Sequence, residues 1–304
     1  YKRQVKGVAF SVNGELIVNS LRPIMSRSEF DKYKPSTRLV EFYPMFKACR
    51  VYVEISRGCS NYYRTFIKLP DGRECTKCDK CRSGNLTERY YCPVGIPPGC
   101  GYCSVPSLYG PPRSRSISNI VNEIEELSRL GVRRIVLSSS DILDYGRDLL
   151  VEPEPLTNPR EPPPNYTMLR KLFKAISSIK RVKSGETIGM IENLKPNLLD
   201  EESAEILGEY FRGTPVHLGC ETGCEEHAKA IGRPSTPKEV IKAVKLLKKY
   251  GLRPYVYFIH GLPGQNMEIA KKTIQIMREV VKAGVEKITV YRFKALPMSA
   301  FGDF

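Results

Sequence analysis

The sequence lacks long hydrophobic runs and is poor in histidine. No window reaches the about eighteen consecutive apolar residues that a membrane-spanning helix needs, so the pattern predicts no such span. The first ten residues, YKRQVKGVAF, lack the apolar core of a signal peptide, and we therefore expect a cytoplasmic protein. Because the chain begins with Tyr1 rather than Met, we expect a piece of a longer protein. The three histidines include His217 and His227, to which the pattern assigns no chemistry.

Acidic residues are outnumbered, with 33 Asp and Glu against 48 Lys and Arg, which gives a net charge of +15. This charge is compatible with a polyanionic partner such as RNA. The alternative is that lysines simply coat solvated helix faces, as in EVIKAVKLLKKYG, a composition typical of hyperthermophile proteins. An RNA partner and a thermophilic source are both expectations at this point.

Cysteine is abundant, with ten residues in a chain for which we expect a compartment where structural disulfides are rare. Eight of the ten fall between Cys49 and Cys103. The spacings C-x2-C-x2-C and C-x2-C within this stretch are typical of metal ligands. The sequence therefore predicts metal sites rather than scattered core thiols.

Short β-branched runs alternate with helical patterns from about Val51 onward, which predicts repeated βα units and a parallel sheet. The six predicted strands are Val51–Ser56, Arg134–Ser139, Thr187–Ile191, Val216–Gly219, Tyr255–Ile259 and Ile288–Tyr291. Apolar residues three and four apart mark five helices between them: around Ile120 with Ser118 as N-cap, around Leu169, after Asp200, from Thr236-Pro237 to Gly251, and through Ile274, Met277 and Val281. This alternation fits either a doubly wound sheet or a partial, six-stranded barrel.

Residues 1–46 precede this array, and we expect them to form an N-terminal hairpin and connector. Two alternating runs flank Asn13-Gly14, the residue pair best suited to a type I′ turn. Residues 47–304 would form the core, with a Cys-rich insert at about 61–99. The proline-dense stretch Val151–Asn165 predicts an extended surface loop.

Three cysteines are placed for chemistry at the sheet. Cys59 directly follows the first predicted strand, and Cys100 and Cys103 precede the first helix of the array, so all three lie on one βα connection. The loops at the carboxyl ends of parallel strands form the active sites of such folds. Three thiolates can bind three irons of a cubane cluster and leave the fourth iron open.

These residues, together with the segments VEISRGCS, CGYCSVPSLYGPPRSRS, GCETG, AIGRPSTPKEVIKAV and HGLPGQ, resemble the radical S-adenosylmethionine superfamily over about Arg50 to Arg292. The resemblance implies a partial (βα)6 TIM-like barrel, a 4Fe-4S cluster on Cys59, Cys100 and Cys103, and reductive cleavage of S-adenosylmethionine to a 5′-deoxyadenosyl radical. It also implies a reductant such as ferredoxin or flavodoxin. In this family the cluster cysteines normally follow the spacing C-x3-C-x2-C, whereas about forty residues separate Cys59 from the C-x2-C pair here. The alternative is that Cys75, Cys78 and Cys81 are the cluster ligands.

The same resemblance implies the cofactor site, for which the candidate residues are Ser139, Ser140, Asp141, Glu221, Arg233 and Gly261. The backbone around the two serines would meet the methionyl amine, and Glu221 the ribose or the amino acid part. Arg233 would hold the methionyl carboxylate, with a solvated arginine as the alternative. Gly261 would let the backbone approach the adenine. Asp141 and Asp144 resemble a cavity-lining run of methylthiotransferases, with a loop cap as the alternative.

The insert carries Cys75, Cys78, Cys81 and Cys92, four soft ligands in a segment without a hydrophobic core of its own. A structural zinc ion is our first interpretation, an auxiliary 4Fe-4S cluster the second, and free thiols the third. We interpret Cys49, Cys220 and Cys224 as ordinary packed thiols.

We expect an enzyme that methylates or methylthiolates an unactivated carbon, with no catalytic side chain assigned. The RSRS and D-x-x-D-Y-G runs look like methylthiotransferases, whose substrates are transfer RNA or a ribosomal protein. The hairpin resembles the connector that follows a cobalamin-binding domain in other members, so cobalamin is expected if such a domain precedes Tyr1. The alternative is a non-catalytic, zinc-stapled RNA-binding protein on a degenerate barrel.

Overall fold

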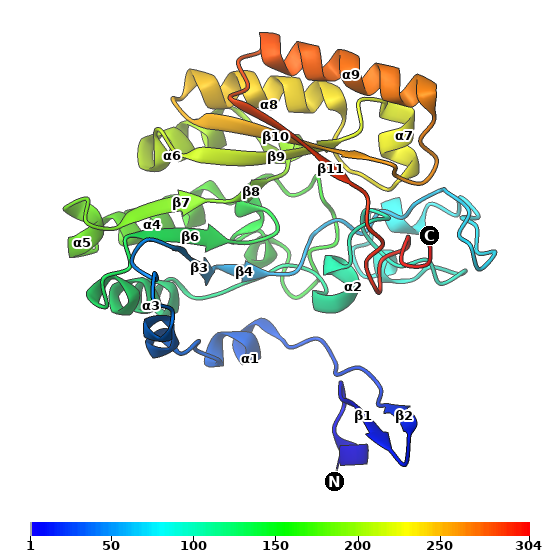
Figure 1. Cartoon of the computed structure of the whole chain (residues 1–304), viewed down its shortest axis with the longest axis horizontal. Coiled ribbons are helices and arrows are strands. Elements are labelled where there is room, and N and C mark those ends of the chain that lie inside the picture. The colour runs from blue at the N-terminus through cyan, green and yellow to red at the C-terminus, as the bar shows by residue number, and fades with distance from the viewer. Residues whose placement is uncertain (1) are drawn as a thin grey trace.

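A curved parallel β-sheet forms the centre of the computed structural model, which describes residues 2–304 (Figure 1). Its first half consists of β3 (Arg50–Glu54), β6 (Arg134–Ser138) and β7 (Ile188–Ile191), and its second half of β8 (Asn193–Leu194), β9 (Pro215–Glu221), β10 (Arg253–His260) and β11 (Lys287–Arg292). Glu192 alone separates β7 from β8, and its carbonyl accepts a hydrogen bond from the His217 amide at 2.9 Å. The two halves therefore continue one another.

The strands follow each other around this array in chain order. A doubly wound sheet reverses its order in the middle, whereas a barrel does not. The partial barrel is therefore confirmed and the doubly wound alternative is wrong. All six predicted strands are present; the prediction missed the short strand β8, which follows Glu192, and a short ribbon described below.

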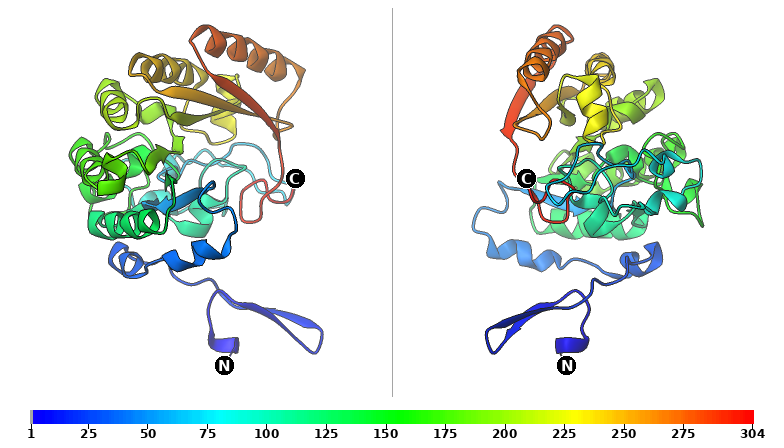
Figure 2. Two further views of the ribbon diagram at one scale, coloured as in Figure 1. Left: turned by 60° about the vertical axis from the view of Figure 1, so that its left-hand side comes forward. Right: turned by 90° about the vertical axis from the view of Figure 1, so that its right-hand side faces the viewer.

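Helices cover the outside of the array (Figures 1 and 2). They are α3 (Ile117–Arg129), α4 (Tyr166–Ser177), α5 (Lys180–Lys183), α6 (Glu201–Phe211), α8 (Pro237–Lys249) and α9 (Met267–Lys282). Three short helices lie elsewhere: α1 (Arg27–Lys32) in the N-terminal segment, and α2 (Val105–Tyr109) and α7 (Glu225–Ala230) at the end of the barrel that carries the insert. The predicted starts at Asp200 and Thr236 are confirmed, because both side chains cap the helix that follows.

Two details of the helix prediction are wrong. The N-cap of α3 is Ser116 rather than Ser118, because Ser116 is still extended and its Oγ accepts the Asn119 amide at 3.3 Å. In α9, Ile274 and Val281 are 49% and 59% exposed, while Val280 is fully buried. The buried face of α9 is therefore rotated relative to the predicted stripe.

The main hydrophobic core lies between the sheet and the helices. It combines strand residues such as Val53, Leu137 and Val256 with helix residues such as Ile120 and Leu172, all nearly inaccessible to solvent. The alternation of β-branched runs and 3.6-residue periodicity in the sequence is what places these side chains on facing surfaces. This packed layer holds the carboxyl ends of the strands in fixed positions.

The N-terminal segment contains the predicted hairpin, with β1 (Ala9–Val12) and β2 (Glu15–Val18) paired antiparallel. Asn13 and Gly14 have φ values of 52° and 83°, as the type I′ turn requires. The hairpin stands away from the barrel in all views (Figures 1 and 2). The division of the chain at residues 46 and 47 stays a prediction.

The Cys-rich stretch 61–99 is irregular, with short 3-10 helices at Lys80–Arg82 and Glu88–Tyr90. It shares a second, smaller hydrophobic cluster with the C-terminal segment, in which Leu69 and Ile96 of the insert pack with Ile231, Leu262 and Phe301. Figure 1 shows the two segments side by side at one end of the barrel. Among the described residues, no helix is long and apolar enough to cross a membrane.

Candidate active site

A cavity of about 700 Å³ opens at the carboxyl ends of the strands, and the three predicted cluster thiols line it. Cys59 comes from the loop after β3, and Cys100 and Cys103 come from the loop before α2. Burial, together with the neighbouring thiols of Cys100 and Cys59, raises the pKa of the Cys103 thiol to about 12. The structure thus brings together three cysteines that the sequence separates by about forty residues.

A short antiparallel ribbon joins the two parts of this ligand set. β4 (Ser56–Arg57), just before Cys59, pairs with β5 (Arg113–Ser114), just after α2. The Cys59 amide donates to the Gly110 carbonyl at 3.0 Å, which continues the ribbon. Gly58 has a φ of 106°, and a Cβ there would lie 2.2 Å from the Pro111 carbonyl oxygen, so only glycine fits. The ribbon therefore closes the base of the long loop that contains the three cysteines and the insert.

Asn61 connects the thiols directly. Its side-chain amide donates to Cys100 Sγ at 3.3 Å and to the Gly232 carbonyl at 2.9 Å, and its backbone amide lies 3.5 Å from Cys59 Sγ. N–H groups aimed at sulfur stabilise thiolate charge and tune an iron–sulfur cluster. Asn61 could not be predicted from the sequence, because an isolated Asn carries no spacing signal.

Asp144 and Lys195 form a buried ion pair next to Cys59. Lys195 Nζ lies 2.6 Å from Asp144 Oδ2 and 2.9 Å from Ser60 Oγ, and Arg147 also pairs with Asp144. Burial favours the protonated acid, but Lys195 and Arg147 together hold the pKa of Asp144 below its ordinary value. Lys195 lines the cavity and was not predicted from the sequence.

Glu221, Arg233 and Tyr102 line the same cavity. Arg233 donates to the Tyr102 hydroxyl at 2.6 Å, to Glu221 Oε1 at 3.2 Å and to the Gly219 carbonyl at 2.6 Å. Burial raises the pKa of Glu221, against the effect of Arg233. Arg233 is buried, so the solvated alternative is wrong. Both of its terminal nitrogens already bind protein groups, and its predicted role as a carboxylate clamp stays a prediction.

The remaining predicted cofactor residues divide into two groups. Ser139 and Ser140 line the cavity beside Ser138, at the end of β6. Asp141 and Gly261 are not among the cavity-lining residues. Gly261 is exposed beyond β10, where its amide donates to Gln265 Oε1 at 2.6 Å.

Asp141 is a loop cap, the alternative that the sequence left open. Its Oδ1 accepts the amides of Leu143 at 3.1 Å and Lys195 at 3.2 Å, while Oδ2 is buried without a hydrogen-bond partner. Burial raises the pKa of Asp141 to about 7. The carboxylate therefore organises the floor beneath the cavity.

The four insert cysteines lie apart from this site and line a small cavity of their own. Burial raises the pKa of Cys75, and the thiols of Cys81, Cys92 and Cys78 are close enough to raise it further. Within residues 2–304, no group of three or more His, Cys, Asp and Glu side chains was recognised as ready to hold a metal ion. In their donor chemistry both cysteine sets suit a metal centre, because each set places soft sulfur ligands around a single cavity.

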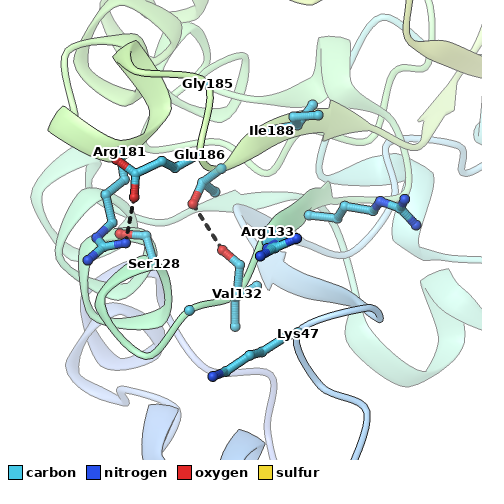
Figure 3. A pocket seen from close by; sticks show the side chains of 11 residues that line it. Lys47, Ser128, Val132, Arg133, Arg181, Gly185, Glu186 and Ile188 are labelled. Atoms are coloured by element: carbon cyan, nitrogen blue, oxygen red, sulfur yellow. Dashed lines mark hydrogen bonds and ion pairs between the residues drawn. The ribbon is translucent and has the colours of Figure 1, made fainter.

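Another hollow lies at the opposite, amino ends of β6 and β7 (Figure 3). Some of its polar groups are paired within the protein: Thr187 Oγ1 donates to the Val132 carbonyl at 2.9 Å, and Arg181 pairs with Glu186 at 2.7 Å. The amino-end face of a βα barrel contributes stability rather than catalysis. We therefore assign no function to this hollow.

Comparison with known proteins bears on the chain as a whole. The family model described as the Radical SAM superfamily matches residues 90–287, a stretch that includes Cys100 and Cys103 and begins after Cys59. An uncharacterized protein of Methanopyrus kandleri is 50% identical over 300 residues, which are 99% of this chain and 54% of that protein. An uncharacterized protein of Methanocaldococcus jannaschii is 45% identical over 95% of this chain and 54% of its own length. The chain thus spans about half the length of these relatives.

More distant relatives have functional names. A tRNA-2-methylthio-N(6)-dimethylallyladenosine synthase of Sulfurihydrogenibium sp. is 28% identical over 65% of this chain and 40% of that protein. Among solved structures, the cobalamin-dependent S-adenosylmethionine radical enzyme OxsB has a TM-score of 0.58 and 13% identity, covering 90% of this chain and 32% of OxsB. The radical S-adenosylmethionine methyltransferase TsrM from Kitasatospora setae has a TM-score of 0.56 and 14% identity, covering 85% of this chain and 39% of TsrM. These two likenesses concern the fold.

Proposed function

The chain belongs to the radical SAM superfamily, and from that premise we propose that it binds a 4Fe-4S cluster through Cys59, Cys100 and Cys103 and cleaves S-adenosylmethionine reductively. The observation that carries the proposal is the meeting of these three thiols on one cavity at the carboxyl ends of the strands. When bound, the cluster supplies one electron to the sulfonium through an iron that no protein thiolate occupies.

The chain's own residues would bind and orient the cofactor. Glu221 carries an acceptor carboxylate on the cavity wall, and Arg233 and Tyr102 fix its position. A carboxylate accepts hydrogen bonds from a ribose diol or an ammonium group. The end of β6 at Ser139 and Ser140 adds further polar groups on the adjoining wall. The cavity therefore has thiolates at one position and polar acceptors around the space where a sulfonium cofactor would lie.

The proposal is tested with anaerobically reconstituted protein. We expect reduced protein to release 5′-deoxyadenosine from S-adenosylmethionine, and we expect Cys59→Ala, Cys100→Ala and Cys103→Ala each to abolish the release. Cys49→Ala is the matched control, because Cys49, against the expectation of a packed thiol, is exposed and does not line the cavity. Release that survives in all three cavity variants would refute the ligand assignment.

Glu221→Gln separates cofactor binding from cluster assembly. The variant keeps the shape of the side chain but removes the charge, so we expect weaker S-adenosylmethionine binding by about tenfold to a hundredfold, the cost of one charge-assisted hydrogen bond. Iron content should stay unchanged. Equilibrium binding of labelled S-adenosylmethionine measures the first quantity, and iron analysis the second.

For the transferred group we propose a methyl or methylthio group placed on an unactivated carbon. The support is the similarity to a named methylthiotransferase and the fold shared with two methyl-transfer or cobalamin-dependent radical enzymes. The net charge of +15 suits a nucleic acid substrate such as transfer RNA. Formation of S-adenosylhomocysteine beside 5′-deoxyadenosine would indicate methyl transfer. If this formation requires added cobalamin in the longer relatives, that result would support the expectation that cobalamin takes part. The comparisons give no support to the non-catalytic RNA-binding alternative.

A further inference from the structure

We propose that the insert holds a second iron–sulfur cluster, a 4Fe-4S cubane bound by Cys75, Cys78, Cys81 and Cys92. All four side chains line one small cavity within the insert. None of them lines the central cavity, whose thiols are Cys59, Cys100 and Cys103. The second site is therefore distinct from the radical site, and it does not depend on the proposed function.

The spacing favours a cubane over the zinc ion that we first expected. Cys75, Cys78 and Cys81 follow the pattern C-x2-C-x2-C, and Cys92 is followed by Pro93. A run of three cysteines two residues apart, with a further Cys-Pro, is the ligand pattern of bacterial ferredoxins, in which each thiolate binds a different iron. Structural zinc sites instead take their cysteines in separated pairs. With a third cysteine directly after the first pair, the insert departs from that pattern.

The backbone between these cysteines is bent tightly around the cavity. Lys77 and Asp79 have φ values of 53° and 55°, a left-handed conformation that costs a non-glycine residue about 1 kcal/mol or more. The Lys77 amide turns inward and lies 3.4 Å from Cys75 Sγ. N–H···S contacts of this kind stabilise thiolates that bind iron. The local strain therefore serves to aim a donor at a ligand sulfur.

Positive side chains lie beside the insert cysteines: Arg64 and Lys77 line their cavity, and Arg82 directly follows Cys81 in the chain. Arg89 is 3% exposed and donates to the carbonyl of Cys81 at 3.3 Å and to that of Ser83 at 2.7 Å. The Arg82 guanidinium lies 4.1 Å from the centre of the Tyr63 ring, and its Nε and Nη2 are buried without hydrogen-bond partners. Buried guanidinium N–H groups without an acceptor are costly unless a negative charge lies nearby. A cubane with four thiolate ligands carries net negative charge and would supply it.

The second cluster would also anchor the loop of the first. Cys75 and Cys92 pack against the hydrophobic cluster that contains Phe301, and Tyr102 packs against the same cluster. The Phe301 ring occupies the space where Gly101 would carry a Cβ, at 2.4 Å, and its amide donates to the Gly101 carbonyl at 2.7 Å. Gly101 lies between the two cysteines of the C-x2-C pair. A cubane in the insert therefore stabilises the wall against which the radical cluster is held.

The test uses the whole chain, reconstituted anaerobically with iron and sulfide, and two sets of variants. We expect about eight irons and eight sulfides per wild-type chain, because each cubane contains four of each. The triple variant combines Cys59→Ala, Cys100→Ala and Cys103→Ala and keeps all four insert thiols. It should retain about four irons and give an electron paramagnetic resonance signal after reduction. Cys78→Ala/Cys81→Ala should lose about half of the wild-type iron, and Cys49→Ala should lose none.

Each other outcome overturns the proposal. If the triple variant binds no iron, or binds one zinc ion in its place, the insert holds no cluster. If Cys78→Ala/Cys81→Ala keeps the wild-type iron content, these thiols are not ligands. Should that double variant fail to fold, the triple variant still decides, since in it the insert is intact. A different result would refute the proposed function: the triple variant would keep all of the wild-type iron and would still release 5′-deoxyadenosine.

Discussion

Lys195→Met tests whether the buried ion pair beside Cys59 holds the radical-site loop in place. In the wild type, Lys195 Nζ contacts Asp144 Oδ2 at 2.6 Å and Ser60 Oγ at 2.9 Å, and the side chain is only 13% exposed. Removing one member of a buried pair costs about 3–5 kcal/mol, because the other charge stays buried without its partner. Arg147 continues to pair with Asp144, so we expect the lower end, about 3 kcal/mol.

The measurement is urea unfolding of the metal-free protein, followed by circular dichroism. Lys249→Met is the matched control, because Lys249 pairs with Glu201 at an exposed position, with 62% of its side chain accessible. Such exposed pairs contribute about 0.5 kcal/mol or less. A double-mutant cycle of Lys195→Met with Asp144→Asn should give a coupling free energy of about 2 kcal/mol, as expected of residues in contact. A cost below about 1 kcal/mol with no coupling would refute the reasoning, since the pair would then carry little of the loop's stability.

Three further predictions concern neighbouring positions. Asn61→Asp removes the amide donor to Cys100 Sγ, so we expect a more negative midpoint potential of the radical-site cluster by spectroelectrochemistry, with Asn61→Gln partly restoring it; an unchanged potential in both variants would contradict this role. Gly58→Ala places a Cβ 2.2 Å from the Pro111 carbonyl oxygen, so we expect the free energy of unfolding in urea to fall by more than about 2 kcal/mol and the radical-site iron to be lost. Gly72→Ala is the control: Gly72 has a φ of 88° but open space around it, so the free energy should fall by about 1 kcal/mol and the iron should be kept. Burial raises the pKa of Asp141 to about 7, so the folded state binds this proton more tightly, and the unfolding free energy should fall as pH rises from about 4 to about 7; Asp141→Asn should remove that part of the slope, and identical pH profiles would contradict the assignment.

The residue patterns were sufficient for the strands themselves and for the two separate thiol sets, whereas the barrel order of the strands was implied only by the resemblance to the radical S-adenosylmethionine superfamily. Alternating β-branched and 3.6-residue patterns identify elements whose burial is regular, which explains why helix starts at Asp200 and Thr236 were correct. The same reasoning placed Ser118 at a cap that Ser116 occupies, because two serines two residues apart are equivalent in the pattern and only the backbone conformation distinguishes them.

Parts of the site could not be predicted, because they depend on contacts between distant segments. Lys195 lies 51 residues from its partner Asp144, and Asn61 lies 39 residues from Cys100. Neither contact leaves a local spacing signal. Asp141 was expected to meet the cofactor through its backbone at the end of the second strand, and this stays a prediction. The sequence left the role of its side chain open, and the structure shows that this side chain caps the loop by accepting the amides of Leu143 and Lys195.

The ribbon formed by Ser56–Arg57 and Arg113–Ser114 makes residues that are distant in the sequence act as one ligand motif. Because cross-strand pairing, rather than peptide continuity, brings the first cysteine to the other two, a long insert between them is compatible with ligands that share one cavity. Pattern searches that demand uninterrupted spacing would overlook such proteins. A search for the three-dimensional arrangement, with the splice point at the ribbon, would recover them and would show which additional modules evolution has grafted at this position.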